Sequence, residues 1–254
     1  MINTFLYAVI LRALLTAEPG QPAREAGGWS WRVPTSQGAV RLWAPEGYDP
    51  ATAATVIYVH GYQRDPDRVW SVARLPAQFR ESGRNALFVV PPAAESDRAP
   101  MRWGRLAELL TGLARRGVTW PEGPVVAVGH SGAYRTLARW ADEPGLQAMV
   151  LLDALYGGEE AFARFAGRGG RLVMVGIYTA RRSLALLRRF PGAPRRADVP
   201  AAAADFTEAE RGAPVVYFGT HLGHAELNDS GEALPVLLDL VLPFAESGAV
   251  LAAN

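Results

Sequence analysis

One stretch of the sequence joins a buried strand, a serine between glycines and the start of a helix. Residues 125–128 are apolar, residues 129–133 read GHSGA, and residues 134–140 have a helical pattern. A serine at a sharp strand-to-helix turn holds its hydroxyl out at the end of a sheet, and small neighbours let that turn close. The following helix directs free N–H groups and a positive dipole end at the same point. The stretch predicts a nucleophile elbow with Ser131 as the nucleophile.

The elbow departs from the full G-x-S-x-G pattern at its fifth position, where Ala133 replaces glycine. Alanine is the mildest departure, because only one methyl group must fit beside the strand. The alternative is a glycine-rich turn that contains an incidental serine. Short motifs also arise by chance, so the assignment needs support from the rest of the chain.

The histidines supply that support. The chain has four, His60, His130, His221 and His224, and all lie at or just past the expected carboxyl ends of strands. In a doubly wound parallel sheet, functional groups gather at that edge. Histidines scattered through a core or a surface would not be expected to collect in this way.

A serine, a carboxylate and a histidine follow one another along the chain as Ser131, Asp153 and His224. A serine hydroxyl is a poor nucleophile until a neighbouring base takes its proton. Histidine titrates in the right range, and a carboxylate fixes the imidazole tautomer and stabilises the imidazolium. We expect Ser131 to be the nucleophile, Asp153 the acid and His224 the base, with His221 as the alternative base.

Two backbone N–H groups are candidates for an oxyanion hole, which acyl transfer needs. One belongs to Gly132, immediately after the serine. The other lies in the loop after the first buried strand, where Tyr62 is the preferred donor and Gly61 lets the backbone approach the substrate.

The chain resembles the α/β-hydrolase superfamily from about residue 39 to the C-terminus. The residues that carry the resemblance are 58–62 (YVHGY), 129–133 (GHSGA), 151–154 (LLDA) and 219–224 (GTHLGH). The resemblance implies a serine hydrolase with the triad order given above. In that superfamily the acid usually follows the strand after next from the serine, where residues 177–180 (IYTA) contain no carboxylate. Some lipase-like members place the acid one strand earlier, where Asp153 stands. Asp205 and Glu208 are rival acids.

The apolar pattern predicts how these residues are positioned. Alternation at residues 29–34 and 39–44 predicts an antiparallel hairpin. Nearly continuous apolar runs predict buried strands at 55–60, 86–90, 125–128, 148–153, 172–178 and 214–219. Helices are expected at 69–82, which Pro76 interrupts, and at 102–116, 134–140, 159–166, 181–190 and 234–244. We expect an α/β-hydrolase fold, with a mostly parallel doubly wound sheet and an N-terminal antiparallel hairpin.

The length of 254 residues suits one large domain. We place it at residues 29–254, after an apolar segment and lead-in at 1–28, with 181–214 as a candidate cap or lid. The net charge of +1 gives no strong field for nucleic acid, and the absence of cysteine excludes thiol catalysis. Residues 5–17 are too short for a comfortable membrane span, so no stable membrane insertion is expected. We favour a cytoplasmic location, with export by a weak N-terminal signal as the alternative.

Five further residues follow strand ends and are candidates to line a substrate pocket: His60, His130, Tyr156, Trp70 and Trp103. Of these, His60 is also expected to brace the oxyanion loop, and His130 to be packed or hydrogen-bonded.

A metal site built from His221, His224, Glu226 and Asp229 is an alternative, because zinc favours histidine and carboxylate ligands. The two histidines are three apart on an expected loop, and the chain contains no H-E-x-x-H helix. We therefore expect neither a metal nor a cofactor.

These features predict a serine hydrolase that cleaves an ester, amide or peptide bond of a small-molecule or peptide-like substrate through an acyl-enzyme. Two alternatives stay open at this point. One is a non-catalytic binding protein with the same fold, and the other is an acyltransferase that uses the same triad.

Overall fold

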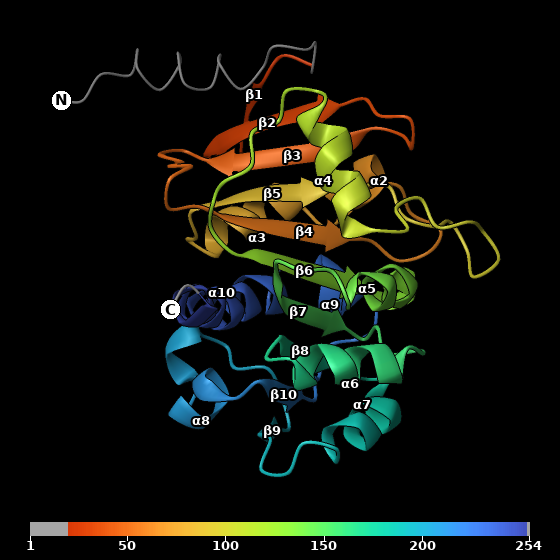
Figure 1. The fold of residues 1–254 in the computed structure, drawn as a ribbon, viewed down its shortest axis with the longest axis vertical. Coiled ribbons are helices and arrows are strands. Elements are labelled where there is room, and N and C mark those ends of the chain that lie inside the picture. Colours follow the sequence, from red (N-terminus) through yellow and green to blue (C-terminus); the bar gives the residue numbers. More distant parts are fainter. Residues whose placement is uncertain (1–19, 253–254) are drawn as a thin grey trace.

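The computed structural model describes residues 20–252, and it describes side chains for residues 20–242. The apolar segment at residues 5–17 lies outside the described residues. The described strands join into one sheet with the order β1-β2-β3-β5-β4-β6-β7-β8-β10-β9 (Figure 1). The strands are β1 (Ala23–Glu25), β2 (Gly28–Val33), β3 (Val40–Pro45), β4 (Ala54–Val59), β5 (Ala86–Val90), β6 (Val125–His130), β7 (Leu146–Leu152), β8 (Arg171–Val175), β9 (Arg195–Arg196) and β10 (Val215–Phe218).

The sheet is antiparallel at its N-terminal edge and parallel elsewhere. Strands β1, β2 and β3 form an antiparallel meander, and β3 pairs antiparallel with β5. All the remaining pairs, from β5–β4 to β10–β9, are parallel. The fold class and the N-terminal hairpin expected from the sequence are confirmed.

Helices cover both faces of the sheet. They are α2 (Pro66–Val72), α3 (Leu75–Glu81), α4 (Leu106–Ala114), α5 (Tyr134–Trp140), α6 (Glu159–Gly167), α7 (Ala180–Leu187), α8 (Glu208–Gly212), α9 (Glu226–Asp229) and α10 (Ala233–Ala252), with short 3-10 turns at η1 (Ser131–Ala133) and η2 (Ala203–Asp205). Helices α4 to α7 pack on one face, and α2, α3 and α10 on the other (Figure 1). No helix in the described range is both long and apolar enough to cross a bilayer.

The core alternates across the central strands. On β4, Ile57 faces the helices α4 to α7, whereas Val56 and Tyr58 face α2, α3 and α10. Every residue of β4 and β5 is buried, because each strand has helices on both sides. This double burial explains why these strands appear in the sequence as apolar runs without alternation.

Several elements differ in extent from the sequence-based expectation; for example, α10 runs to Ala252 where the helix was expected to end at residue 244. The helix expected at 69–82 is two helices, because Arg74 has a φ of 49° and Pro76 lies in the first turn of α3. The helix expected at 102–116 begins only at Leu106. The strand expected at 172–178 ends at Val175, because the backbone beyond it turns to bond Asp153.

The expected lead-in and the candidate cap or lid both contain regular secondary structure. Residues 23–25 of the expected lead-in form β1, which pairs with β2. Residues 181–214 contain most of α7, then β9, η2 and α8, and β9 forms the edge of the sheet beside β10. The role of this range as a cap or lid stays a prediction.

Candidate active site

Ser131 lies in a strained turn at the carboxyl end of β6. Its φ is 55°, in the left-handed region that side chains other than glycine rarely adopt. Directly after it, η1 leads into α5. Backbone strain of this kind concentrates at functional sites, where the surrounding structure holds it in place.

Packing around the turn explains the alanine in the elbow motif. A Cβ on Gly129 would lie 2.8 Å from Leu137 Cδ2 and 3.0 Å from the Cβ of Ala133. The space that glycine leaves at position 129 is therefore the space that the Ala133 methyl group occupies. Gly129, two residues before the serine, therefore makes room for Ala133 at the fifth position of the motif.

His224 lies between Ser131 and Asp153. Its Nε2 is 3.0 Å from Ser131 Oγ, and its Nδ1 is 2.6 Å from Asp153 Oδ2. The structure thus brings together the three residues that the sequence places in chain order. His221, the alternative base, points elsewhere: its side chain is 64% exposed, and its Nδ1 lies 2.5 Å from Asp198 Oδ2.

A ring of donors keeps Asp153 ionised. The side chain is fully buried, and Oδ1 accepts hydrogen bonds from the N–H of Ile177 (2.9 Å), the N–H of Thr179 (2.9 Å) and the Thr179 hydroxyl (2.8 Å). Burial alone would raise the pKa of Asp153. The hydrogen bonds from His224, Thr179 and Ile177 outweigh it and hold this pKa well below its usual range.

The charge on Asp153 decides the tautomer of His224. A carboxylate only accepts hydrogen bonds, so His224 Nδ1 carries a proton and donates a hydrogen bond to Asp153. The lone pair of Nε2 then faces Ser131 Oγ, where it can take the hydroxyl proton. This is the arrangement that activates a serine.

The loop after β4 lies directly against the elbow. A Cβ on Gly61 would come within 2.9 Å of the Ser131 Cβ, and a Cβ on Gly132 would lie 2.5 Å from the ring of Tyr62. Glycine at both positions therefore permits the close approach that the expected oxyanion donors, the N–H groups of Tyr62 and Gly132, require.

Many solved structures are similar to this chain, and three of them serve as examples. The feruloyl esterase module of Clostridium thermocellum has a TM-score of 0.56 at 13% identity, covering 90% of this chain and 94% of its own. An S-formylglutathione hydrolase from Agrobacterium tumefaciens has a TM-score of 0.51 at 12% identity, covering 89% of this chain and 99% of its own. The fluorophosphonate-binding serine hydrolase F of Staphylococcus aureus has a TM-score of 0.55 at 11% identity, covering 87% of this chain and 99% of its own.

The chain has the α/β-hydrolase fold. No protein-family model matches the sequence, and no curated protein matches it either. Because one fold hosts many activities, the assignment of function depends on the site itself.

In this α/β-hydrolase fold, His60 supports the loop that follows β4. It is buried, and its Nε2 accepts the N–H of Ala93 at 3.1 Å, so its Nδ1 carries the proton and donates to Gly61 O at 2.8 Å. Burial lowers the pKa of His60 and so favours this neutral form. Its contacts are those of a brace for the loop.

His130 braces the base. Its Nε2 donates to the backbone carbonyl of His224 at 2.9 Å, and the two ring centroids are 4.7 Å apart. Burial lowers the pKa of His130 to about 4, so its ring is neutral at pH 7. His130 therefore fixes the loop that carries His224 without adding a charge beside it.

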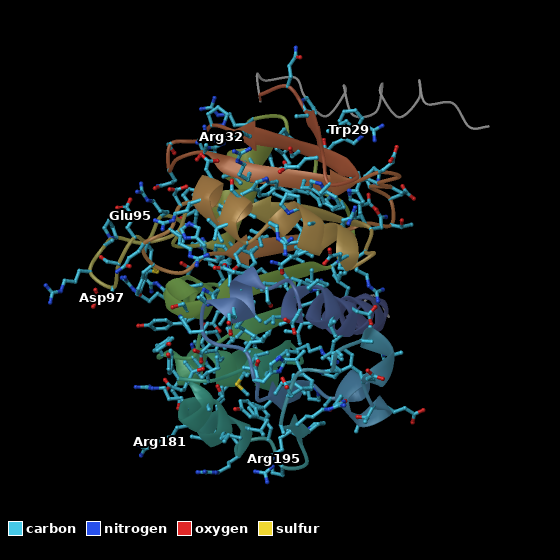
Figure 2. All side chains as sticks on the ribbon, turned by 180° about the vertical axis from the view of Figure 1, so that it is seen from behind. Trp29, Arg32, Glu95, Asp97, Arg181 and Arg195 are labelled. Carbon is cyan, nitrogen blue, oxygen red and sulfur yellow. The ribbon has the colours of Figure 1, made fainter. Side chains whose placement is uncertain are left out.

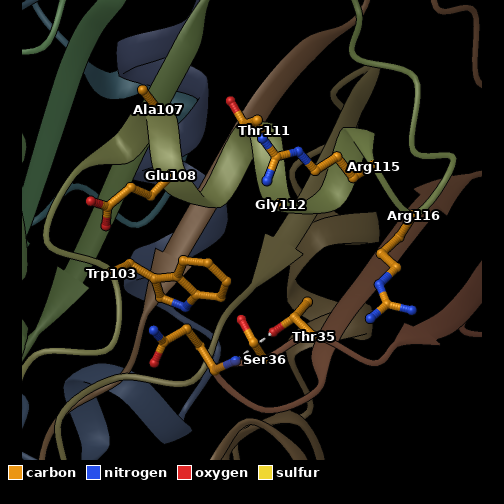
Figure 3. Close-up of a pocket in the computed structure, with 10 residues that line it drawn as sticks. Thr35, Ser36, Trp103, Ala107, Glu108, Thr111, Gly112, Arg115 and Arg116 are labelled. Carbon is orange, nitrogen blue, oxygen red and sulfur yellow. Dashed lines mark hydrogen bonds between the residues drawn. The ribbon is translucent and has the colours of Figure 1, made fainter.

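The two candidate tryptophans pack in other parts of the molecule. The Trp70 indole N–H donates to Glu25 at 3.0 Å, next to β1. Trp103 lines a separate cavity of about 580 Å³ between α4 and the turn that joins β2 to β3 (Figure 3). Of the five pocket candidates, His130 and Tyr156 have ring contacts with His224; the centroid of the Tyr156 ring lies 6.3 Å from that of His224.

Sequence reasoning missed an ion pair that joins the loop after β4 to α9, the helix that follows His224. Arg64 donates two hydrogen bonds to Asp229 in α9, at 2.8 and 2.9 Å. The pair is largely shielded from solvent, and it raises the pKa of Arg64. The two residues are 165 positions apart, and no local pattern in the sequence links them.

A second missed residue, Arg135, anchors the projecting loop between β5 and α4, on which Figure 2 labels Glu95 and Asp97. Its guanidinium donates to the carbonyls of Ser96 at 3.0 Å and Ala99 at 3.2 Å. Because Arg135 stands one turn after Ser131 on α5, this loop is held against the elbow helix. Its only sequence signal is its spacing from the serine.

Proposed function

We propose that this protein is a serine hydrolase that cleaves a carboxylic ester through an acyl-enzyme. One observation carries the proposal: an unbroken hydrogen-bonded line from Ser131 Oγ through His224 to a carboxylate that the fold keeps ionised. The names of the solved neighbours, which are esterases and serine hydrolases, favour an ester over an amide or peptide bond.

In the first half-reaction, His224 Nε2 takes the proton of Ser131 as Oγ attacks the ester carbonyl. The N–H groups of Gly132 and Tyr62 stabilise the negative oxygen of the tetrahedral intermediate. His224 then passes its proton to the departing alkoxide, which leaves as an alcohol while Ser131 carries the acyl group. Asp153 stabilises the imidazolium in between.

In the second half-reaction, water takes the place of the alcohol. His224 removes a proton from the water as its oxygen attacks the acyl-enzyme, and the same proton returns to Ser131 Oγ when the carboxylic acid leaves. The cycle consumes one water and restores the enzyme.

Hydrolysis of phenyl acetate by wild type and by Ser131→Ala tests the proposal. The variant is expected to lose at least about 1,000-fold in kcat/KM, since it lacks the nucleophile, while its thermal melt stays close to that of wild type. Ser36→Ala, in the turn between β2 and β3, is the matched control and should keep full activity. Equal turnover by wild type and Ser131→Ala would rule the mechanism out, and acetanilide run alongside tests the preference for esters over amides.

A further inference from the structure

The chemistry of the base restricts where the alcohol portion of an ester can lie. The departing oxygen must come within hydrogen-bonding reach of His224 Nε2 to receive its proton. The carbonyl oxygen faces the other way, towards the amides of Gly132 and Tyr62. Whatever is attached to the departing oxygen therefore lies against the groups around the His224 ring.

Two tyrosine rings contact the ring of His224. The centroid of Tyr178 lies 5.5 Å from that of His224, with the planes tilted by 36°. The centroid of Tyr156 lies 6.3 Å away, edge-on at 84°. Because His130 packs against His224 as well, these two rings are the aromatic surface that an incoming alcohol group meets.

Both rings are exposed, which is unusual in this molecule. Among the described residues, three large apolar side chains are strongly exposed: Tyr178 (73%), Val72 (51%) and Tyr156 (37%). Two of the three thus stand beside His224. Exposed apolar surface that gathers at one place marks a binding site more often than scattered exposure does.

The backbone that carries Tyr178, and the ring of Tyr156, are held in place next to the acid. The N–H of Tyr178 lies 3.4 Å from Asp153 Oδ2, between two neighbours whose N–H groups bond Oδ1 at 2.9 Å. Tyr156 follows Asp153 by three residues and packs against Tyr134, at 6.2 Å between centroids. Rings that are ordered before binding lose little entropy when a ligand arrives.

We propose that Tyr156 and Tyr178 form a leaving-group subsite that selects esters of aromatic alcohols, such as benzyl esters. The inference rests on the proposed function and adds its substrate class. A flat ring can stack offset on one tyrosine and meet the edge of the other, whereas a puckered ring of similar size cannot. Burial and the nearby charge of Asp153 raise the pKa of Tyr156 to about 12, so this residue presents a neutral phenol at assay pH.

A matched pair of esters tests the subsite. Benzyl acetate and cyclohexylmethyl acetate share the acyl group, and both release a primary alcohol, but only one carries an aromatic ring. Wild type is expected to favour benzyl acetate about tenfold in kcat/KM, the size expected of one good aromatic contact. Both esters pass through the same acetyl-enzyme, so the preference belongs in kcat/KM and disappears from kcat where deacylation limits the rate. Moving the ring to the acyl side, with ethyl phenylacetate against ethyl cyclohexylacetate, should leave a much smaller ratio.

Variants assign the preference to the two rings. Tyr178→Leu and Tyr156→Leu keep apolar bulk but remove the aromatic faces, and each should lower the benzyl preference, with the double variant near 1. Tyr178→Phe should retain it, and Val72→Ala is the control for an exposed apolar side chain elsewhere. Equal kcat/KM for both acetates in wild type, or an unchanged ratio in the double variant, overturns the subsite alone. If wild type hydrolyses neither ester, the proposed function fails, and the subsite fails with it.

Discussion

Replacing Asp153 by asparagine is expected to remove most of the activity by changing one tautomer. Three donors, from Ile177 and Thr179, face Oδ1, so the carbonyl oxygen of the new amide takes that position. The NH₂ group must then take the position of Oδ2, where it faces His224 Nδ1. Since NH₂ donates, Nδ1 becomes an acceptor and the ring proton moves to Nε2. His224 can then no longer accept the proton of Ser131.

The same tautomer fault in a serine–histidine–aspartate triad costs about 10⁴-fold in kcat, or about 5.4 kcal/mol at 1.36 kcal/mol per factor of ten. We expect a loss of that order for Asp153→Asn, measured as kcat on phenyl acetate, with a folded protein in a thermal melt. Asp205→Asn changes an exposed carboxylate and is the matched control. A folded Asp153→Asn that loses less than tenfold, or an equal loss in Asp205→Asn, would refute the reasoning.

Three further predictions concern the elbow and its supports. Burial lowers the pKa of His130 from 6.5 to about 4, so stability is intact above pH 6.5 and falls by about 3 kcal/mol as the pH drops to 4 and below. Urea midpoints at pH 7.5 and 4.5 should show a smaller acid loss in His130→Gln, and equal losses would contradict the account. Gly129→Ala should lower the free energy of unfolding by about 1–3 kcal/mol, because its methyl group overpacks Leu137 and Ala133. Adding Ala133→Gly should restore part of that loss. If urea unfolding shows that the effects of the two substitutions are strictly additive, the result argues against this contact. Ser131→Gly should be inactive yet about 1 kcal/mol more stable than Ser131→Ala, because glycine relieves the strain at a φ of 55°; a lower melting temperature for the glycine variant would exclude strain relief.

The fold could be predicted from the sequence because its signals are local. Apolar runs such as residues 55–60 and 86–90 match β4 and β5, since strands covered on both faces have no polar side to show. The predicted end of β8 was wrong by three residues. Residues 176–178 continue the apolar pattern, but their backbone turns to meet the carboxylate of Asp153, a contact that the local pattern does not show.

The site was predictable only in part. Ser131 and Asp153 stand at strand ends, where the topology of the sheet brings them near one another. The sequence favours His224 over His221 as the base but leaves His221 as an alternative, because the two are three residues apart and Asp198, which contacts His221, belongs to a distant segment. Spacing after a strand end also cannot tell on which side of the sheet a tryptophan packs. The sequence therefore does not reveal that Trp70 interacts with Glu25.

The account is tested most directly by mapping the residue that a fluorophosphonate probe modifies. Peptide mass spectrometry of the labelled, folded wild type should show one adduct, on Ser131, and His224→Gln should label far more slowly because its serine is not activated. An adduct on a different residue, or no adduct on protein that hydrolyses phenyl acetate, would contradict the central claim.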